Sequence, residues 1–422
     1  MTDDCEPGHF GVGCFRLWMY LIMPFMSGFV GYGTNALALK MTFLPIEFLG
    51  VEMWRMKDQP WGLFGWQGII PTKAEKMATI CVTLMTKKLF DIKELFGRLQ
   101  PEKFYDSMED VLLLLIDEIL NEVAGAYMPK TWNNYLPKSV KSEVVLSAHR
   151  ACPEFLTAFI LDMQQNIENV LDIQEMCVSA CVENKEIVNK VFLECGEKEF
   201  VFIRRSGFYF GFLFGCVQTI IWIFYDASWV LPVCGFIVGW FTNYLALKII
   251  FRPLVPRKIG HYTLQGLFLK RQNEVSETFA RVTCTELLDT EKIWGCILTG
   301  PKRRNFQLLL RAHSIVFTEK LIGGLRPIAV AALGSEQFAN MKEDIATKVL
   351  EKIPEIIVHS YDYTTDALDL ENTIKEEMQN LSAEQFEGVL HPAFEEDEMT
   401  LIMVGGFLGM VVGLIQIAMF SV

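Results

Sequence analysis

Four stretches of the chain are apolar over a length that suits a membrane-crossing helix. About 20 apolar residues, at roughly 1.5 Å per residue, span a hydrocarbon layer of roughly 30 Å, and few helices in soluble cores are that long. Strongly polar side chains are rare in these stretches, and Gln416 is the main exception in the last one. The pattern therefore predicts an integral membrane protein. The predicted spans are residues 17–39, 206–225, 229–248 and 399–422.

The long segments between the spans carry apolar residues at helical spacing. Phe159 and Met163 begin one such face, and sustained strand alternation is absent from the sequence. The acidic N-terminus lacks the basic start of a cleaved signal, so we expect the first span to be retained. The predicted fold class is an all-α integral membrane protein with four transmembrane helices and two helical lobes. The N-terminus covers residues 1–16, lobe 1 covers 40–205 and lobe 2 covers 249–398.

The chain contains an internal repeat. The stretch "GYGTNALALKMTFLP", which begins at Gly31, returns as "GWFTNYLALKIIFRP", which begins at Gly239. After a shift of 198 positions, "GIIPTKAEKM" from Gly68 falls on "GLFLKRQNEV" from Gly266. Such self-similarity indicates a tandem duplication of one two-span unit. The predicted copies are residues 1–225 and 226–422.

The number of crossings and the basic residues predict how the copies lie in the membrane. Two crossings per copy give both copies the same orientation, so the copies are parallel. Basic residues gather where the lobes meet the spans, as at Arg204, Arg205, Arg257 and Lys258. By the positive-inside rule, both lobes should lie on the cytoplasmic, stromal or matrix side of a membrane that the sequence does not identify.

The acidic balance of the chain limits its partners. The formal net charge is -13, and residues 362–398 hold much of the acidic excess with Lys375 as their only lysine or arginine. A surface of this charge repels phosphate groups, so we expect no nucleic-acid partner. The expected partners are membrane lipids, a protein bound to the lobes and, as a further option, a second copy of the chain.

A Thr-Asn pair occurs near the end of the first and third spans. An amide in hydrocarbon must find a hydrogen-bond partner or stay unsatisfied. One interpretation is a bond that fixes helix packing, and the other is a polar vestibule for an ion or a lipid head group. The lysine that follows each pair is expected to extend to the membrane interface. The residues of this membrane polar motif are Thr34, Asn35, Lys40, Thr242, Asn243 and Lys248.

Glycines recur every four residues in the second and fourth spans, and each series is followed by a glutamine. This spacing leaves a bare groove on a helix, where a second backbone can approach closely. We expect the opening helix of the same copy to fill the groove and the glutamine to cap it, which gives a pseudo-twofold four-helix core. The helix-packing residues are Gly207, Gly211, Gly215, Gln218, Gly405, Gly409, Gly413 and Gln416.

Three cations lie where helices are predicted to begin. The helix dipole disfavours a positive charge there unless an anion lies near. Contact with an anionic lipid head group is one interpretation, and a solvated charged face is the other. The residues are Lys73, Lys270 and Arg271.

Eleven cysteines are spread along the chain without the framework of a secreted disulfide protein, so we expect reduced thiols. Cys177 and Cys181 are spaced to reach one metal ion together with Cys152 or Cys195. They also fall on an apolar helical stripe, which favours a place in the protein core. We expect no metal and no cofactor.

Recognisable catalytic motifs are missing from the sequence. It has no P-loop, no His-Glu-x-x-His and no Gly-x-Ser-x-Gly, and its six histidines are scattered. We therefore expect a protein that is not an enzyme.

The repeated motifs carry a resemblance to a known family. The stretches "TNALALK" and "TNYLALK", the following "GIIPTK" and the closing "GGFLGMVVGLIQ" resemble the domain of unknown function 445 family, which overlaps the uncharacterised protein family 0754. The resemblance implies a bacterial-type inner-membrane or thylakoid protein with a long helical middle. It implies no activity.

Two functions are open at this point. The preferred one is a membrane-anchored, non-catalytic scaffold or membrane-organising protein, because the helical lobes are large beside a small membrane part. The alternative is transport or transfer of a lipid or small solute through the pseudo-twofold helical core, because the Thr-Asn pair occurs twice in membrane helices.

Overall fold

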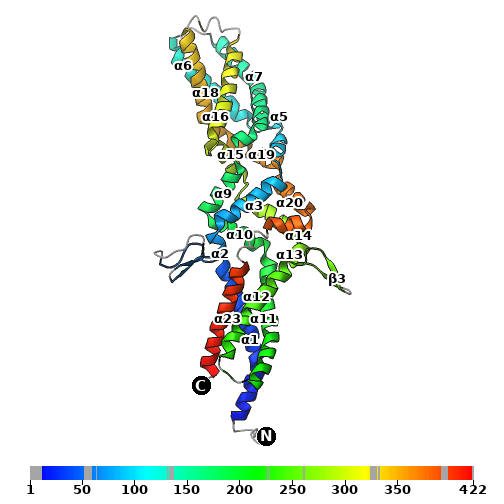
Figure 1. The fold of residues 1–422 in the computed structure, drawn as a ribbon. Helices are drawn as coiled ribbons and strands as arrows, with labels where there is room; N and C mark the ends of the chain where they lie inside the picture. Colours follow the sequence, from blue (N-terminus) through cyan, green and yellow to red (C-terminus); the bar gives the residue numbers. More distant parts are fainter. Residues whose placement is uncertain are drawn as a thin grey trace. The chain divides into compact units, whose positions relative to one another are not determined.

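In the residues that the computed structural model describes, the chain folds into helices and two short β-hairpins (Figure 1). It forms two compact units, and each unit takes segments from both halves of the sequence. Unit 1 comprises Met1–Met85, Ala180–Val282 and Lys375–Val422, and unit 2 comprises Thr86–Ser179 and Thr283–Ile374. The described residues are 12–51, 59–62, 64–130, 132, 137–225, 227, 229–259, 262–323, 330, 333–390 and 398–420.

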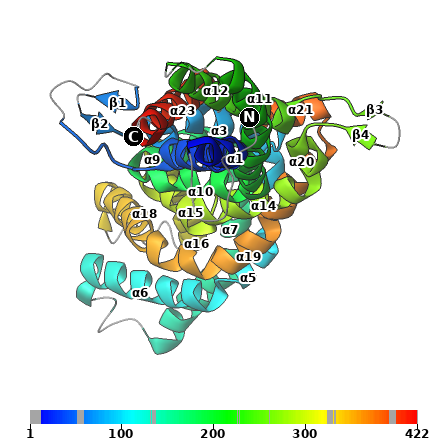
Figure 2. The same ribbon diagram turned by 90° about the horizontal axis from the view of Figure 1, so that it is seen from below.

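Unit 1 is built around four long helices, which Figure 2 shows gathered together. They are α1 (Val12–Phe43), α11 (Glu197–Phe224), α12 (Val230–Phe251) and α23 (Glu398–Phe420). Its short helices are α2 (Ile69–Thr72), α10 (Lys185–Cys195), α13 (Leu267–Lys270) and α21 (Ala383–Leu390), and the boundaries with unit 2 fall within α3 (Ala74–Lys88), α9 (Ile173–Glu183), α14 (Gln272–Glu286) and α20 (Leu370–Asn380).

Four described helices are long and apolar enough to cross a membrane: α7 (Lys138–Gln165), α11, α12 and the Glu398–Ile417 part of α23. The last three coincide with predicted spans. The first predicted span, residues 17–39, forms part of α1, which is not among these four. The sequence pattern did not predict α7 as a span. Both the prediction and the described residues thus give four apolar helices, but α7 stands where the prediction has residues 17–39.

The long helices of unit 1 pack as two pairs. α1 lies along α11, and α12 lies along α23, while α11 contacts α12 and α1 contacts α23. A Cβ atom at Gly31 would clash with the carbonyl oxygen of Gly207, and one at Gly239 would clash with that of Gly405. Glycine is therefore required for the backbones to come this close.

Two short β-hairpins correct the all-α prediction. β1 (Trp61–Gly62) pairs antiparallel with β2 (Gly65–Trp66), and β3 (Arg257–Ile259) pairs antiparallel with β4 (Tyr262–Leu264). Strands of two and three residues are too short to show the alternation of polar and apolar positions by which a strand is predicted. Each hairpin follows one of the two opening helices, α1 or α12.

Several elements of the two halves correspond in position and geometry. α2 and α13 begin 198 residues apart, and so do α3 and α14. Gly68, which precedes α2, has φ -53° and ψ 143°, and Gly266, which precedes α13, has φ -49° and ψ 134°. Both opening helices are also followed by a cis X-Pro bond, at Pro45 and Pro253.

Unit 2 is a helical body with one core made from both halves of the sequence. α7 packs against α6 of its own half and against α16, and α18 packs against α16 of its own half and against α6. The rings of Phe159 and Phe306 meet in this core, with centroids 5.8 Å apart. The central parts of the two predicted lobes, 40–205 and 249–398, thus share a core. The helices are α4 (Ile92–Gly97), α5 (Pro101–Asp106), α6 (Glu109–Tyr127), α7, α8 (Ile167–Val170), α15 (Thr290–Thr299), α16 (Arg303–Ile322), α18 (Ser335–Ile357), the 3-10 helix η4 (Val358–Ser360) and α19 (Tyr361–Leu368).

We expect Gly31→Ala to destabilise the protein, because the added methyl group must displace the backbone at Gly207. Overpacking of this kind costs about 1–3 kcal/mol. Gly33→Ala on the same helix is the matched control, since a Cβ atom there meets nothing within 4 Å. Thermal unfolding of both variants in detergent checks the prediction, and equal midpoints would contradict the close packing of α1 and α11.

Candidate functional site

The asparagines of the Thr-Asn pairs tie the opening helices to the closing helices. The Asn35 Nδ2 group donates a hydrogen bond to the carbonyl oxygen of Ile203 on α11 at 2.9 Å. Both residues are buried where α1 packs against α11. The Asn243 Nδ2 group donates in the same way to the carbonyl oxygen of Leu401 on α23 at 3.0 Å. The acceptors lie 198 positions apart, so both pairs make the same bond at corresponding places.

The threonines of the pairs bond within their own helix. The Thr34 hydroxyl donates to the carbonyl oxygen of Gly31 at 3.1 Å, and the Thr242 hydroxyl donates to that of Gly239 at 3.2 Å. Both threonines are buried. Their hydroxyl groups are therefore satisfied without reaching a neighbouring helix, so within each Thr-Asn pair it is the asparagine that bonds to the next helix.

The glycine series provides the space in which these amides sit. A Cβ atom at Gly207 would lie 2.7 Å from Asn35 Nδ2, and one at Gly405 would clash with Asn243 Nδ2. A Cβ atom at Gly215 would lie 2.7 Å from the Cα atom of Pro24. The remaining glycines of the series likewise face the opening helix of their own half: Gly211, Gly409 and Gly413.

The two glutamines that follow the glycines line a small gap among the four long helices, whose lining is mostly apolar with a few polar side chains. The Ser27 hydroxyl donates to Gln218 Oε1 at 3.4 Å, and Gln416 lies at the same gap together with Thr34. Its volume of about 20 Å³ has room for about one water molecule. The carboxamide oxygen of Asn35 is also buried and has no hydrogen-bond partner among the described residues. The space among the four long helices therefore has polar groups at isolated points.

The lysines of the polar motif point outward. Lys40 and Lys248 are both exposed, and Lys248 Nζ lies 5.6 Å from the ring centre of Tyr244. This geometry suits a lysine whose stem runs along apolar surface toward an interface.

Arg271, one of the three predicted head-group cations, pairs with carboxylates of the protein itself. Arg271 Nη1 donates to both carboxylate oxygens of Glu199 at 2.8 and 2.7 Å, and Arg271 Nε donates to Glu274 at 3.0 Å. The Glu199 side chain is 4% exposed, so this ion pair is nearly buried. Hydrogen bonds from Lys198 and Arg271 lower the pKa of Glu274. Arg271 thus links α11 to the start of α14, whereas the neighbouring Lys270 is exposed.

Sequence reasoning missed Glu199, although a signal for it exists. The residue lies in the first turn of α11, only a few residues before the apolar run begins. A carboxylate so close to a membrane span needs a cation nearby. Its partner lies 72 positions away, and a single sequence does not reveal such a pairing.

The cysteines behave as core residues. Cys177 and Cys181 are buried on α9. Burial is the main cause that raises the pKa of both Cys152 and Cys195 to about 12, so these thiols stay protonated at neutral pH. Among the described residues, no group of three or more histidine, cysteine or acidic side chains is arranged to hold a metal ion.

Comparison with known proteins adds a family relationship to this geometry. No protein-family model matches the chain, and no solved structure matches it. UPF0754 membrane proteins from Bacillus cereus and Bacillus anthracis are each 30% identical over 153 residues, which is 35% of this chain and 39% of theirs. A UPF0754 membrane protein from Nostoc punctiforme is 31% identical over 113 residues, which is 25% of each chain.

The chain is a relative of the UPF0754 membrane proteins. It spans less than half of the length of the UPF0754 proteins that it matches. Together with the four apolar helices, this relationship supports a place in a membrane. The UPF0754 name carries no activity, and the broader resemblance to the domain of unknown function 445 stays a prediction.

We expect Arg271→Met to destabilise the protein strongly, because it leaves the Glu199 carboxylate buried without its cation. Breaking a buried pair from one side costs about 3–5 kcal/mol. Lys270→Met removes the same charge from an exposed neighbour and should change stability by less than about 0.5 kcal/mol. Chemical unfolding in detergent measures both effects. A loss for Arg271→Met no larger than for Lys270→Met would show that the pair does not stabilise the fold.

Proposed function

We propose that this protein is a membrane-anchored, non-catalytic scaffold. The observation that carries the proposal is that the buried amides of Asn35 and Asn243 each donate a hydrogen bond to a backbone carbonyl of the adjacent helix. Each bond lies where glycines let the two helices come close together. The polar groups of the anchor are thus engaged mainly in holding helices together. The helical mass outside the anchor then serves to bind a partner or to organise the membrane surface.

The anchor has two similar halves, and this supports a tandem duplication with parallel copies at residues 1–225 and 226–422. The amide bonds, the glycine contacts and the start of α2 and α13 recur at corresponding positions in the two halves. In this arrangement α1, α11, α12 and α23 cross the membrane. The basic residues beside the helices, such as Arg204 and Lys258, favour a cytoplasmic, stromal or matrix position for the remaining helices.

α7 belongs outside the membrane in this proposal, although its composition would allow it to cross. Contacts between ionisable side chains occur along its length: His149 Nε2 lies 2.8 Å from Asp117, and Asp162 lies 2.9 Å from His313 Nε2. Glu154 also pairs with Lys320. Ionisable groups at membrane depth are costly, so a helix with such contacts on several turns is better placed in water.

A protein partner should be found on unit 2. We expect cross-linking of the full chain in its native membrane to join exposed lysines of this unit, such as Lys103 and Lys138, to a second polypeptide. Mass spectrometry of the cross-linked peptides identifies the partner, and membranes without the chain are the control. Cross-links confined to the chain itself and to its own copies would overturn the scaffold.

The alternative function is transfer of a lipid or small solute. The unpartnered Asn35 oxygen and the polar side chains Gln218 and Gln416 at the small gap favour it. We expect Asn35→Leu with Asn243→Leu to lower stability by about 1–3 kcal/mol through loss of two bonds between helices. A scaffold should give no scrambling of fluorescent NBD-phosphatidylcholine in liposomes, with or without these changes.

The scrambling assay separates the two functions when Asn121→Leu, an exposed site, is included as a control. Lipid scrambling by the wild-type chain and by Asn121→Leu, together with loss of scrambling in a folded double variant, would overturn the scaffold proposal in favour of lipid transfer. Thermal unfolding of each variant shows whether it remains folded.

A further inference from the structure

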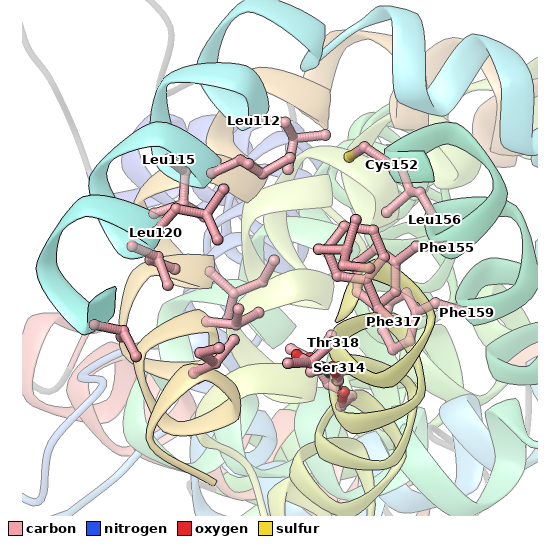
Figure 3. Close-up of a pocket in the computed structure, with 18 of the residues that line it drawn as sticks. Leu112, Leu115, Leu120, Cys152, Phe155, Leu156, Phe159, Ser314, Phe317 and Thr318 are labelled. Atoms are coloured by element: carbon pink, nitrogen blue, oxygen red, sulfur yellow. Dashed lines mark hydrogen bonds between the residues drawn. The ribbon is translucent and has the colours of Figure 1, made fainter. Parts of the chain in front are cut away.

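Unit 2 contains an apolar cavity between its long helices (Figure 3). Its volume is about 170 Å³. Leu115 on α6, Phe155 and Leu156 on α7 and Phe317 on α16 border it. The rings of Phe155 and Phe317 meet at 4.9 Å between centroids and form one wall. Both halves of the sequence therefore contribute to the lining.

The hydroxyl groups at this cavity are already engaged. The Ser314 hydroxyl donates to the carbonyl oxygen of Leu310 at 2.8 Å, and the Thr318 hydroxyl donates to that of Ser314 at 2.8 Å, so both bond within α16. Cys152 faces the cavity as a thiol. A buried water needs two to four polar partners. The described lining side chains do not offer them, so water is a poor occupant.

An empty apolar cavity also destabilises a fold, because its lining loses packing contacts. A peptide segment is unsuited to the space, since its N–H and C=O groups would be buried without partners. A hydrocarbon chain has no such groups. The protein has apolar helices of membrane-spanning length, and its relatives are named membrane proteins. The tails of membrane lipids are therefore the hydrocarbon chains that it encounters.

We propose that the cavity of unit 2 binds the terminal part of one hydrocarbon tail of a membrane lipid. The volume limits the occupant to one tail, because an apolar cavity of roughly 150 Å³ is known to admit a single benzene ring. The lining extends along α6 from Met108 to Ala124, which is about 24 Å at 1.5 Å per residue. A narrow, unbranched chain suits this extended lining. This binding site goes beyond the scaffold role and does not depend on it.

Photolabelling tests the proposal. A palmitic acid that carries a diazirine at its terminal carbon is added to membranes that contain the full chain, and labelled peptides are identified by mass spectrometry after illumination. We expect labels on the cavity-lining turns of α6, α7 or α16, and we expect unlabelled palmitate in excess to reduce them several-fold. Labels on α23 serve as an internal reference for contact with bulk lipid.

Two filled variants and a control decide whether the label reports the cavity. Ser314→Leu with Thr318→Leu places two larger side chains in the space, and Ala124→Leu fills it from α6. Both should reduce the unit 2 label several-fold while the α23 label stays constant. Thr347→Leu makes the same chemical change at an exposed position of α18 and should leave both labels unchanged.

The outcomes are distinct. Labels on α23 with none on unit 2, or an equal unit 2 label in every folded variant, would overturn the proposal. Thermal unfolding shows which variants are folded, and the single change Ala124→Leu retains the test if the double change fails to fold.

Discussion

The hydrogen bond from an asparagine amide to a carbonyl on the next helix is the interaction on which unit 1 depends. In a hydrocarbon layer, apolar side chains gain little by leaving lipid for protein, so helices associate through close packing and polar bonds. Glycines bring α1 against α11, which lets Asn35 reach Ile203. The amide of Asn189 on α10 donates to the carbonyl oxygen of Phe43 at 2.7 Å, and this bond ties the end of α1 to a further helix. The position of α1 thus determines the position of its neighbours.

Features that recur with a fixed period can be expected from the sequence alone. Glycines at 207, 211 and 215 repeat at the helical spacing, and in the structure α1 lies against them. The packing interpretation of Asn35 and Asn243 also has a direct structural counterpart. Periodic patterns can be read from one sequence because residues at the helical spacing lie on one face of the helix and share one environment.

Features that depend on two distant segments were not predictable in this way. The Glu199–Arg271 pair joins residues far apart in the chain, so nothing local identifies either partner. α11 begins at Glu197 rather than 206, because its first turns are polar and lie outside the apolar run that defines a span. The shared core of unit 2 was not predictable for the same reason. An amphipathic stripe indicates that one face of a helix is buried, but it does not identify which other helix buries it.

The shared core of unit 2 has a consequence for synthesis of the protein. α6 and α7 find their cross-half partners α18 and α16 only after the ribosome has added residues 166–357. At roughly 5–20 residues per second this takes roughly 10–40 s. During that time the apolar stripes of α6 and α7 lack these partners, and a chaperone or the membrane surface must shield them. A nascent chain halted between the two halves would therefore be aggregation-prone even though its first two long apolar helices are already complete.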